Sequence, residues 1–211
     1  MRKFTTIILL WSTFSILSTQ LSAQNADIEL LRSINHTSGT GLRNYSKFIS
    51  NTTTAVAVST PLVMGVVALI EQNDDLLKNA LYVGVSLGVD GVITYSMKEL
   101  VKRPRPYVTY PDITGYQTET SLSFPSGHTS LAFTTATALS LKYSKWYVIA
   151  PTYFWACSVG YSRMNLGMHY PSDVLAGAIV GSGSAYVTYL VNNWFWKKNQ
   201  NKKLVGLQAY L

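Results

Sequence analysis

Residues 174–196 read VLAGAIVGSGSAYVTYLVNNWFW and contain no Asp, Glu, Lys or Arg. An apolar run of about 20 residues is long enough for a helix to cross the hydrocarbon core of a bilayer. Four more apolar segments, separated by polar loops, are residues 51–70, 79–97, 125–141 and 146–162, and the only charged residue among them is Asp90. The pattern predicts an all-α helical bundle that is integral to a membrane, with about five to six transmembrane helices.

The composition agrees with one membrane-embedded domain. Apolar residues make up 47% of the 211 residues and charged residues only 13%, an unusual balance for a soluble protein. Thr, Ser and Gly are nevertheless frequent and the mean hydropathy is only +0.14, so a soluble bundle of buried helices stays open as the alternative. The single cysteine, Cys157, has no partner in the chain and excludes a disulfide framework.

The N-terminal region divides into two segments. Arg2 and Lys3 precede an apolar stretch and then small and polar residues up to Ala23, which is typical of a signal peptide over 1–23 or of an uncleaved N-terminal anchor. Residues 24–50 mix apolar and basic side chains at helical spacing and are expected to form an amphipathic helical segment of the kind that lies on a membrane surface. Residues 51–211 remain for the main helical domain.

The distribution of lysines predicts the orientation. If the new N-terminus lies outside, five spans place 97–124 and 162–173 outside, with the lysine-rich segments 142–145 and 197–203 inside. The acidic loop 71–75 also falls inside and gives no support. The basic start of 97–124 falls outside, against the positive-inside tendency, which indicates that its cations serve chemistry. Segments 97–124 and 162–173 are thus expected to open on the same, outer face.

The net charge of +7 does not indicate a nucleic-acid partner. The cations gather in the C-terminal tail and between Lys98 and Arg105, without the interleaved aromatics of a nucleic-acid-binding stripe. The sequence also carries no sign of an obligate protein partner.

The first motif is Lys98 followed by Arg105-Pro106. Fixed cations suit a phosphoryl group because transfer spreads negative charge over its oxygens, and an arginine can bind two of those oxygens at once. Pro104 and Pro106 are expected to stop the helix and stiffen the turn that aims these side chains. A basic cluster that contacts lipid head groups is the alternative.

The second motif is Pro125-Ser126-Gly127-His128, directly before an apolar run, and it predicts a helix start. The free amides of a first turn attract anions, Ser126 can cap the helix or donate its hydroxyl, and Gly127 lets a phosphate approach the backbone. His128 would project into that site. An ordinary helix cap is the alternative.

The third motif joins Ser162-Arg163 to His169 and Asp173, with Pro171 at a natural first position of the next helix. A carboxylate in that first turn can accept one imidazole N–H and leave the other nitrogen free as a nucleophile. The alternative is that Asp173 only favours the helix N-terminus, an effect of about 0.3–1 kcal/mol, which leaves His169 unexplained.

In this order and spacing the motifs resemble the signature K-x6-RP, PSGH, SR-x5-H-x3-D of the type 2 phosphatidic acid phosphatase superfamily, which includes class A acid phosphatases and vanadium-dependent haloperoxidases. The resemblance covers residues 60–195. It implies a phosphohistidine on His169, oriented by Asp173, with His128 as general acid and then general base. It implies that phosphate oxygens are held by Lys98, Arg105, Ser126, Gly127 and Arg163. It implies no metal and no cofactor.

We therefore expect a metal-independent phosphatase acting on a membrane lipid phosphate at the periplasmic face of a bacterial inner membrane. Phosphatidic acid, phosphatidylglycerol phosphate, an isoprenyl diphosphate and a lipid A phosphate all fit, because the motifs do not read the leaving group. A soluble periplasmic acid phosphatase for small esters and a vanadate-dependent haloperoxidase are the alternatives. Asp90, inside an apolar segment, is either functional or bonded to a neighbouring helix.

Overall fold

The computed structural model describes residues 25–37 and 39–208, with side chains described as far as Trp196. The signal peptide or anchor expected over 1–23 lies outside these residues. Every regular element in the described ranges is a helix, which confirms the all-α class. A helix over 25–36 is followed by α2 (Thr40–Ile70), α3 (Asp74–Val101), α4 (Pro106–Thr109), α5 (Gly127–Lys142), α6 (Trp146–Asn165) and α7 (Pro171–Gln208).

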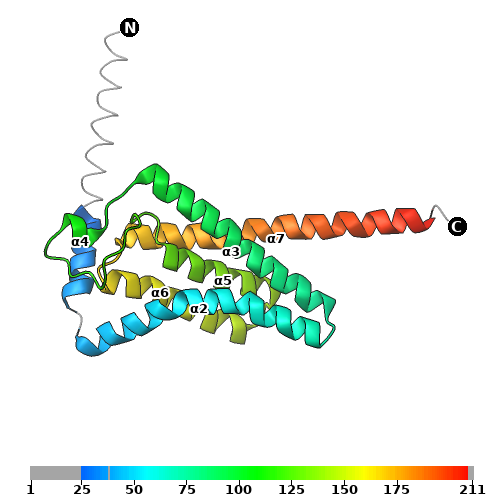
Figure 1. Ribbon diagram of the computed structural model, residues 1–211, viewed down its shortest axis with the longest axis horizontal. Coiled ribbons are helices and arrows are strands. Elements are labelled where there is room, and N and C mark those ends of the chain that lie inside the picture. Colours follow the sequence, from blue (N-terminus) through cyan, green and yellow to red (C-terminus); the bar gives the residue numbers. More distant parts are fainter. Residues whose placement is uncertain (1–24, 38, 209–211) are drawn as a thin grey trace, which may run out of the picture.

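Helix α5 forms the centre of the bundle and packs against α2, α3, α6 and α7 (Figure 1). Its buried residues are all Thr, Ser or Ala, small side chains that let the neighbouring helices approach closely. A Cβ at Gly181 of α7 would lie only 2.1 Å from the Ser130 carbonyl oxygen. Thr134 donates to that same carbonyl at 2.9 Å and to the Gly181 carbonyl at 3.1 Å. The α5–α7 contact therefore requires glycine.

Three of the described helices are long and apolar enough to cross a membrane: α2, the segment Asp74–Thr109 that contains α3, and Pro171–Trp196 of α7. Many large apolar side chains on these helices are exposed, as a lipid-facing surface requires. The expected segments 125–141 and 146–162 correspond to α5 and α6. Neither of these two helices is both long and apolar enough to count as membrane-crossing by the same measure. Because protein encloses α5, its Thr and Ser side chains do not have to be apolar, as lipid-facing side chains would. The count of five to six spans stays a prediction.

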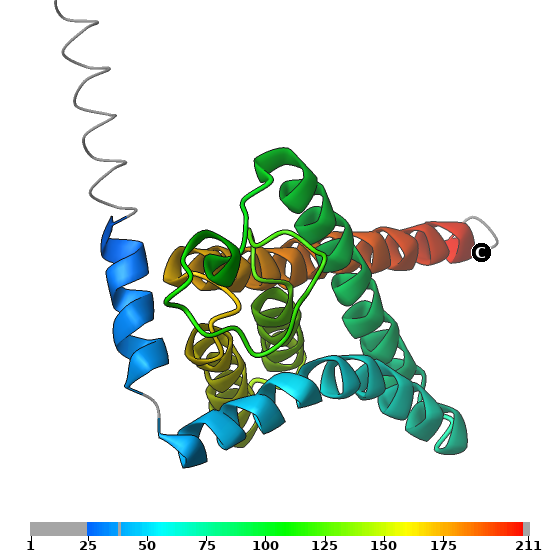
Figure 2. The same cartoon turned by 60° about the vertical axis from the view of Figure 1, so that its left-hand side comes forward.

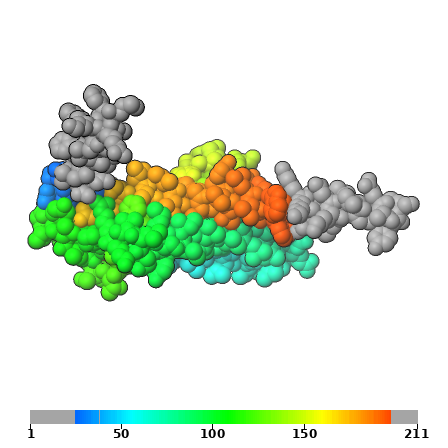
Figure 3. Space-filling model, turned by 90° about the horizontal axis from the view of Figure 1, so that it is seen from above, coloured from blue at the N-terminus to red at the C-terminus, as the bar shows by residue number. Residues whose placement is uncertain are grey.

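One end of the bundle is covered by two additions (Figures 2 and 3). The loop 110–126 lies over the start of α5, and the helix over 25–36 lies at the same end. Ile28 and Leu31 of that helix are buried in a cluster with Ile113 of the loop. The expected segment 24–50 is thus divided between this helix and the first part of α2, and its buried apolar residues pack on protein.

The helix starts lie where the prolines and caps place them. Helix α5 begins at Gly127 after the N-cap residue Ser126, and α7 begins at Pro171, as predicted. The expectation for Pro106 is wrong: α3 already ends at Val101, and Pro106 opens α4. Its fixed φ and missing N–H suit a first helical position.

Asp90 lies in α3, where it is 2% exposed and accepts a hydrogen bond from Ser130 of α5. Thr94 donates to the same Ser130 hydroxyl at 3.2 Å. Of the two roles considered for Asp90, the structure shows the bond between helices.

Candidate active site

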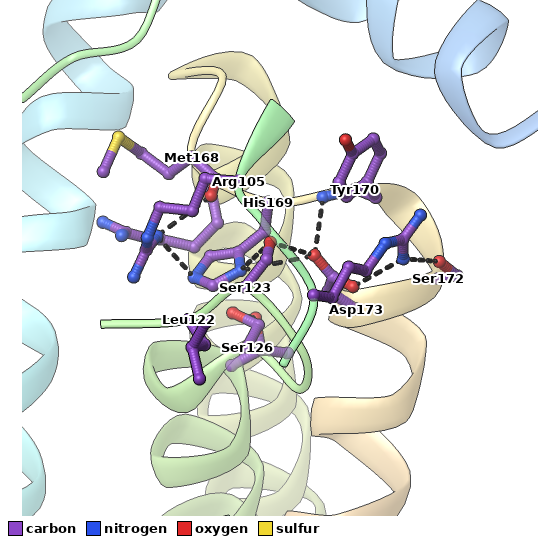
Figure 4. A network of polar contacts seen from close by, with 12 residues as sticks. Arg105, Leu122, Ser123, Ser126, Met168, His169, Tyr170, Ser172 and Asp173 are labelled. Atoms are coloured by element: carbon purple, nitrogen blue, oxygen red, sulfur yellow. Dashed lines mark hydrogen bonds and ion pairs between the residues drawn. The ribbon is translucent and has the colours of Figure 1, made fainter. Parts of the chain in front are cut away.

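The three motifs meet at the covered end of the bundle (Figure 4). The Ser126 amide donates to the Asp173 carbonyl at 3.0 Å, which joins the second motif to the third. Arg105 Nη1 donates to the Met168 carbonyl at 3.0 Å, which joins the first motif to the third. Segments far apart in the sequence therefore form one site.

His169 lies between a cation and a carboxylate, and it is 1% exposed. Its Nε2 is 3.2 Å from Arg105 Nη1, and its Nδ1 is 3.5 Å from Asp173 Oδ2 (Figure 4). The same Asp173 oxygen accepts from the Tyr170 amide at 3.0 Å and from the Ser123 hydroxyl at 2.5 Å. One imidazole nitrogen thus faces the carboxylate and the other faces the arginine, which is the arrangement a histidine nucleophile needs.

The protonation of His169 agrees with that arrangement. Burial lowers the pKa of His169 to about 3, and Arg163 and Arg105 also act to lower it, while the interaction with Asp173 opposes them without cancelling them. The imidazole is therefore neutral near pH 7. Only the neutral ring has a lone pair with which to attack phosphorus.

The two arginines are held almost entirely out of water. Arg105 is 3% exposed, and its Nε and Nη2 donate at 2.8 Å to the backbone and the hydroxyl of Ser121. Arg163 is 1% exposed and donates from Nη1 to the Ser50 hydroxyl at 2.7 Å. Its buried Nε has no hydrogen-bond partner among the described residues. Two buried cations require an anion that balances their charge.

That anion is Glu119, which sequence reasoning missed. Its Oε1 accepts from Arg163 Nη2 at 2.7 Å, and its Oε2 accepts from Arg105 Nη2. Burial alone would raise the pKa of Glu119, but Arg163 and Arg105 outweigh it and bring the pKa to about 2. The loop over the site has two acids, Asp112 and Glu119. Because two buried arginines need a carboxylate, the sequence carries a signal that points to one of these acids.

Lys98 and His128 lie beside this group and are half-buried. Lys98, near the end of α3, donates to the Leu122 carbonyl of the covering loop. His128 lies in the first turn of α5, within electrostatic reach of Arg163 and Glu119. Both residues are brought to the site, as the motifs predicted.

Ser126 and Gly127 form the start of α5. The Ser126 side chain makes no capping bond; its hydroxyl pairs with the Thr129 hydroxyl at 2.9 Å instead. A Cβ at Gly127 would meet only the Thr94 methyl, at 3.8 Å, so there is room beside the backbone here. The first-turn amides of α5 have no partner within the helix, as at every helix start, and suit an anion.

Within the described ranges, no three His, Cys, Asp or Glu side chains come together as a metal site requires. The expectation of a metal-independent reaction stays a prediction.

Residues 79–197, more than half of the chain, match the model of the PAP2 superfamily. The chain belongs to this superfamily. The matched range contains Lys98, His128, His169 and Asp173, and the resemblance of the three motifs is thereby confirmed.

Relatives within the superfamily include lipid phosphatases. The chain is 31% identical over 124 residues to the undecaprenyl-diphosphatase of Sulfolobus acidocaldarius, covering 56% of this chain and 59% of that protein. It is 35% identical over 68 residues to the lipid A 4'-phosphatase of Bacteroides thetaiotaomicron, covering 32% of this chain and 30% of that protein. The alignments with these relatives thus span less than two thirds of their length.

The fold is also that of a solved membrane member of the superfamily. The transmembrane PAP2 type phosphatidylglycerolphosphate phosphatase from Bacillus subtilis superposes with a TM-score of 0.69, covering 88% of this chain and 95% of that one, at 24% identity. This likeness shows that the two chains share a fold.

Proposed function

We propose that this PAP2 protein is a phosphatase that hydrolyses a membrane lipid phosphomonoester or diphosphate through a phosphohistidine on His169. The observation that carries the proposal is the position of His169, with Nδ1 facing Asp173 and Nε2 beside Arg105 at 3.2 Å. A buried neutral imidazole, fixed on one side by a carboxylate and directed at a cation on the other, is prepared to attack an anionic phosphorus centre.

In the first step His169 Nε2 attacks phosphorus, forming the P–N bond while the P–O bond to the lipid breaks. His128, which takes up a proton from solvent as the phosphate dianion binds beside it, protonates the departing oxygen. Arg105 and Arg163 bind the phosphoryl oxygens as their charge redistributes, together with Lys98. Asp173 stabilises the positive charge that the phosphorylated imidazole acquires.

In the second step water attacks phosphorus. His128, now neutral, takes the proton from that water, the P–N bond breaks, and inorganic phosphate leaves with His169 restored. The two steps return every group to its starting protonation state.

The carboxylate of Glu119 must give way before phosphate binds. It occupies one Nη donor of each arginine, and the phosphoryl group needs the same donors. A phosphate dianion carries more charge than a carboxylate and offers more oxygens to the cations. Glu119 belongs to the covering loop, so its displacement requires no movement of a bundle helix.

The lipid class rests on three supports. The apolar helices α2, α3 and α7 are long enough to cross a bilayer. The site lies at the end of these helices, where a lipid head group would be. Two relatives of the chain are named for undecaprenyl diphosphate and for lipid A. We place the site on the periplasmic face of a bacterial inner membrane because the lysine-rich segments 142–145 and 197–203, which we expect on the inner side, lie at the opposite end of the bundle.

The test is phosphate release from a panel of lipid phosphates in detergent, with His169→Ala as the blank. We expect release by the wild type and none by the variant. Activity on small soluble esters alone, with release of the protein by carbonate extraction, would instead establish a soluble acid phosphatase. Bromide oxidation with vanadate and peroxide would establish a haloperoxidase. Full activity of His169→Ala would overturn the mechanism.

A further inference from the structure

Arg103 is a cation of the basic cluster that none of the three motifs uses. It lies in the turn after α3, between Lys102, whose φ of 51° is left-handed, and Pro104. The Arg103 carbonyl accepts from the Ser123 amide at 2.8 Å, which ties this turn to the covering loop. Backbone on both sides is thus constrained, and the direction of the side chain with it.

The guanidinium of Arg103 binds Asp173 on the side of the carboxylate that is turned away from His169. Its Nη1 lies 2.7 Å from Asp173 Oδ1, while Asp173 Oδ2 is the oxygen that faces His169. The Asp173 side chain is fully buried. Its two oxygens are thereby divided, one on a fixed cation and one on the imidazole.

Arg103 is itself held from three directions. Asp27, on the helix over 25–36, binds Nη2 at 2.8 Å, and the Ser172 hydroxyl accepts from Nη1 at 2.7 Å. The guanidinium carbon lies 3.7 Å from the centre of the Tyr170 ring, a close cation–π contact. Asp27 also accepts from the Ser172 amide at 2.8 Å. The network therefore ties the N-terminal helix to the first turn of α7.

This network is separate from the arginines that are proposed to bind phosphate. Among the described residues, the contacts of Arg103 are with Asp173, Ser172, Asp27, Tyr170 and Ser123. In those same ranges, none is with Arg105, Arg163 or Glu119. An effect of Arg103 on catalysis would consequently pass through Asp173.

We propose that Arg103 is a positioning residue for the His169–Asp173 pair, and that Asp27 holds Arg103 in that role. The inference rests on the proposed phosphohistidine reaction. A carboxylate with one oxygen fixed on a guanidinium that is itself held at both Nη atoms cannot rotate away from the imidazole, so Nδ1 stays paired and Nε2 stays directed at phosphorus. By this reasoning the N-terminal helix contributes through Asp27 alone to holding Asp173 in place.

The experiment measures kcat and KM on a lipid phosphate for wild type, Arg103→Ala, Arg103→Lys and Asp27→Ala. We expect kcat of Arg103→Ala to fall about 10- to 100-fold, the equivalent of one lost hydrogen bond to a charged group, with KM within about twofold. Arg103→Lys keeps the positive charge but lacks the paired N–H donors of a guanidinium, and it should recover part of kcat. Asp27→Ala should lower kcat less, and adding it to Arg103→Ala should cost nothing further.

The matched control is Arg32→Ala. Arg32 lies on the same N-terminal helix as Asp27. It binds Asp112, a carboxylate of the covering loop, at 2.8 Å, whereas Arg103 binds Asp173. We expect the kcat of Arg32→Ala to stay at the wild-type value. An equal loss in Arg32→Ala would show that only docking of the helix matters and would overturn the inference.

Three results separate this inference from the proposed function. Unchanged kcat in Arg103→Ala, or a rise in KM alone, would overturn the positioning role while the wild type stays active. If Arg103→Ala does not fold, unchanged kcat in both Arg103→Lys and Asp27→Ala would overturn it equally. A wild type that releases no phosphate, or an active His169→Ala, would overturn the proposed function and this inference with it.

Discussion

Glu119 Oε1 lies 2.7 Å from Arg163 Nη2, a donor that the proposed function assigns to a phosphoryl oxygen. The other oxygen of the same carboxylate pairs with Arg105. One side chain of the covering loop thus satisfies the two buried cations of the site. The carboxylate lowers the free-energy cost of keeping both arginines buried, and under the proposed function it competes with phosphate for the same donors.

Glu119→Gln should therefore bind phosphate more tightly. We expect the inhibition constant of inorganic phosphate to fall roughly tenfold, because the amide no longer competes as an anion for the two arginines. Asp112→Asn, the other acid of the loop, is the control and should leave the constant unchanged. Weaker phosphate binding by Glu119→Gln would mean that Glu119 assists phosphate rather than competing with it.

The acid stability of the protein should depend on the same carboxylate. The folded pKa of Glu119, about 2, lies below the ordinary value of 4.5, so its contribution to stability is complete above pH 4.5 and is lost as the pH falls toward 2. Between these pH values the thermal midpoint of the wild type should fall more steeply than that of Glu119→Gln. Parallel curves in the absence of phosphate would contradict this assignment.

His169 should add a second, higher window of acid sensitivity. Its folded pKa, about 3, lies below the ordinary value of 6.5, so a lower pH protonates the unfolded state first and stability is lost as the pH falls from 6.5 toward 3. The slope due to one such group is at most about 1.4 kcal/mol per pH unit. Denaturant unfolding of His169→Ala should show a shallower slope there; an unaltered slope would contradict the buried neutral state.

Sequence reasoning found the parts of the site that depend on local structure. Pro171 and Ser126 start their helices where helix-start chemistry places them, and the four-residue step from His169 to Asp173 spans one such start. These relationships lie within a few residues, so local geometry determines them.

Contacts made by irregular loops could not be predicted in the same way. Glu119 lies in a loop without periodicity, and its partners Arg105 and Arg163 come from different parts of the chain. Arg103 and Arg105 are two residues apart, yet one binds Asp173 and the other Glu119, because the turn at Lys102 and the start of α4 direct them apart. Only the three-dimensional path of the chain separates their roles.

The packing of α5 on α7 supplies a prediction about the fold. Gly181→Ala would place a methyl group 2.1 Å from the Ser130 carbonyl oxygen, whereas a Cβ at Gly183 meets nothing within 4 Å. We expect Gly181→Ala to lose about 2 kcal/mol or more, or to fail to fold, because the helices cannot separate locally without losing their contacts. Equal thermal midpoints for Gly181→Ala and Gly183→Ala in detergent would contradict the close approach of these two helices.

The proposed reaction passes through a covalent phosphohistidine on His169. The decisive measurement is rapid acid-free quenching after the protein is mixed with a lipid substrate labelled in its phosphate, followed by mapping of the base-stable label. We predict label on the peptide that contains His169 in the wild type and no label in His169→Ala. Phosphate release by the wild type without any labelled enzyme, or label on a different residue, would contradict it.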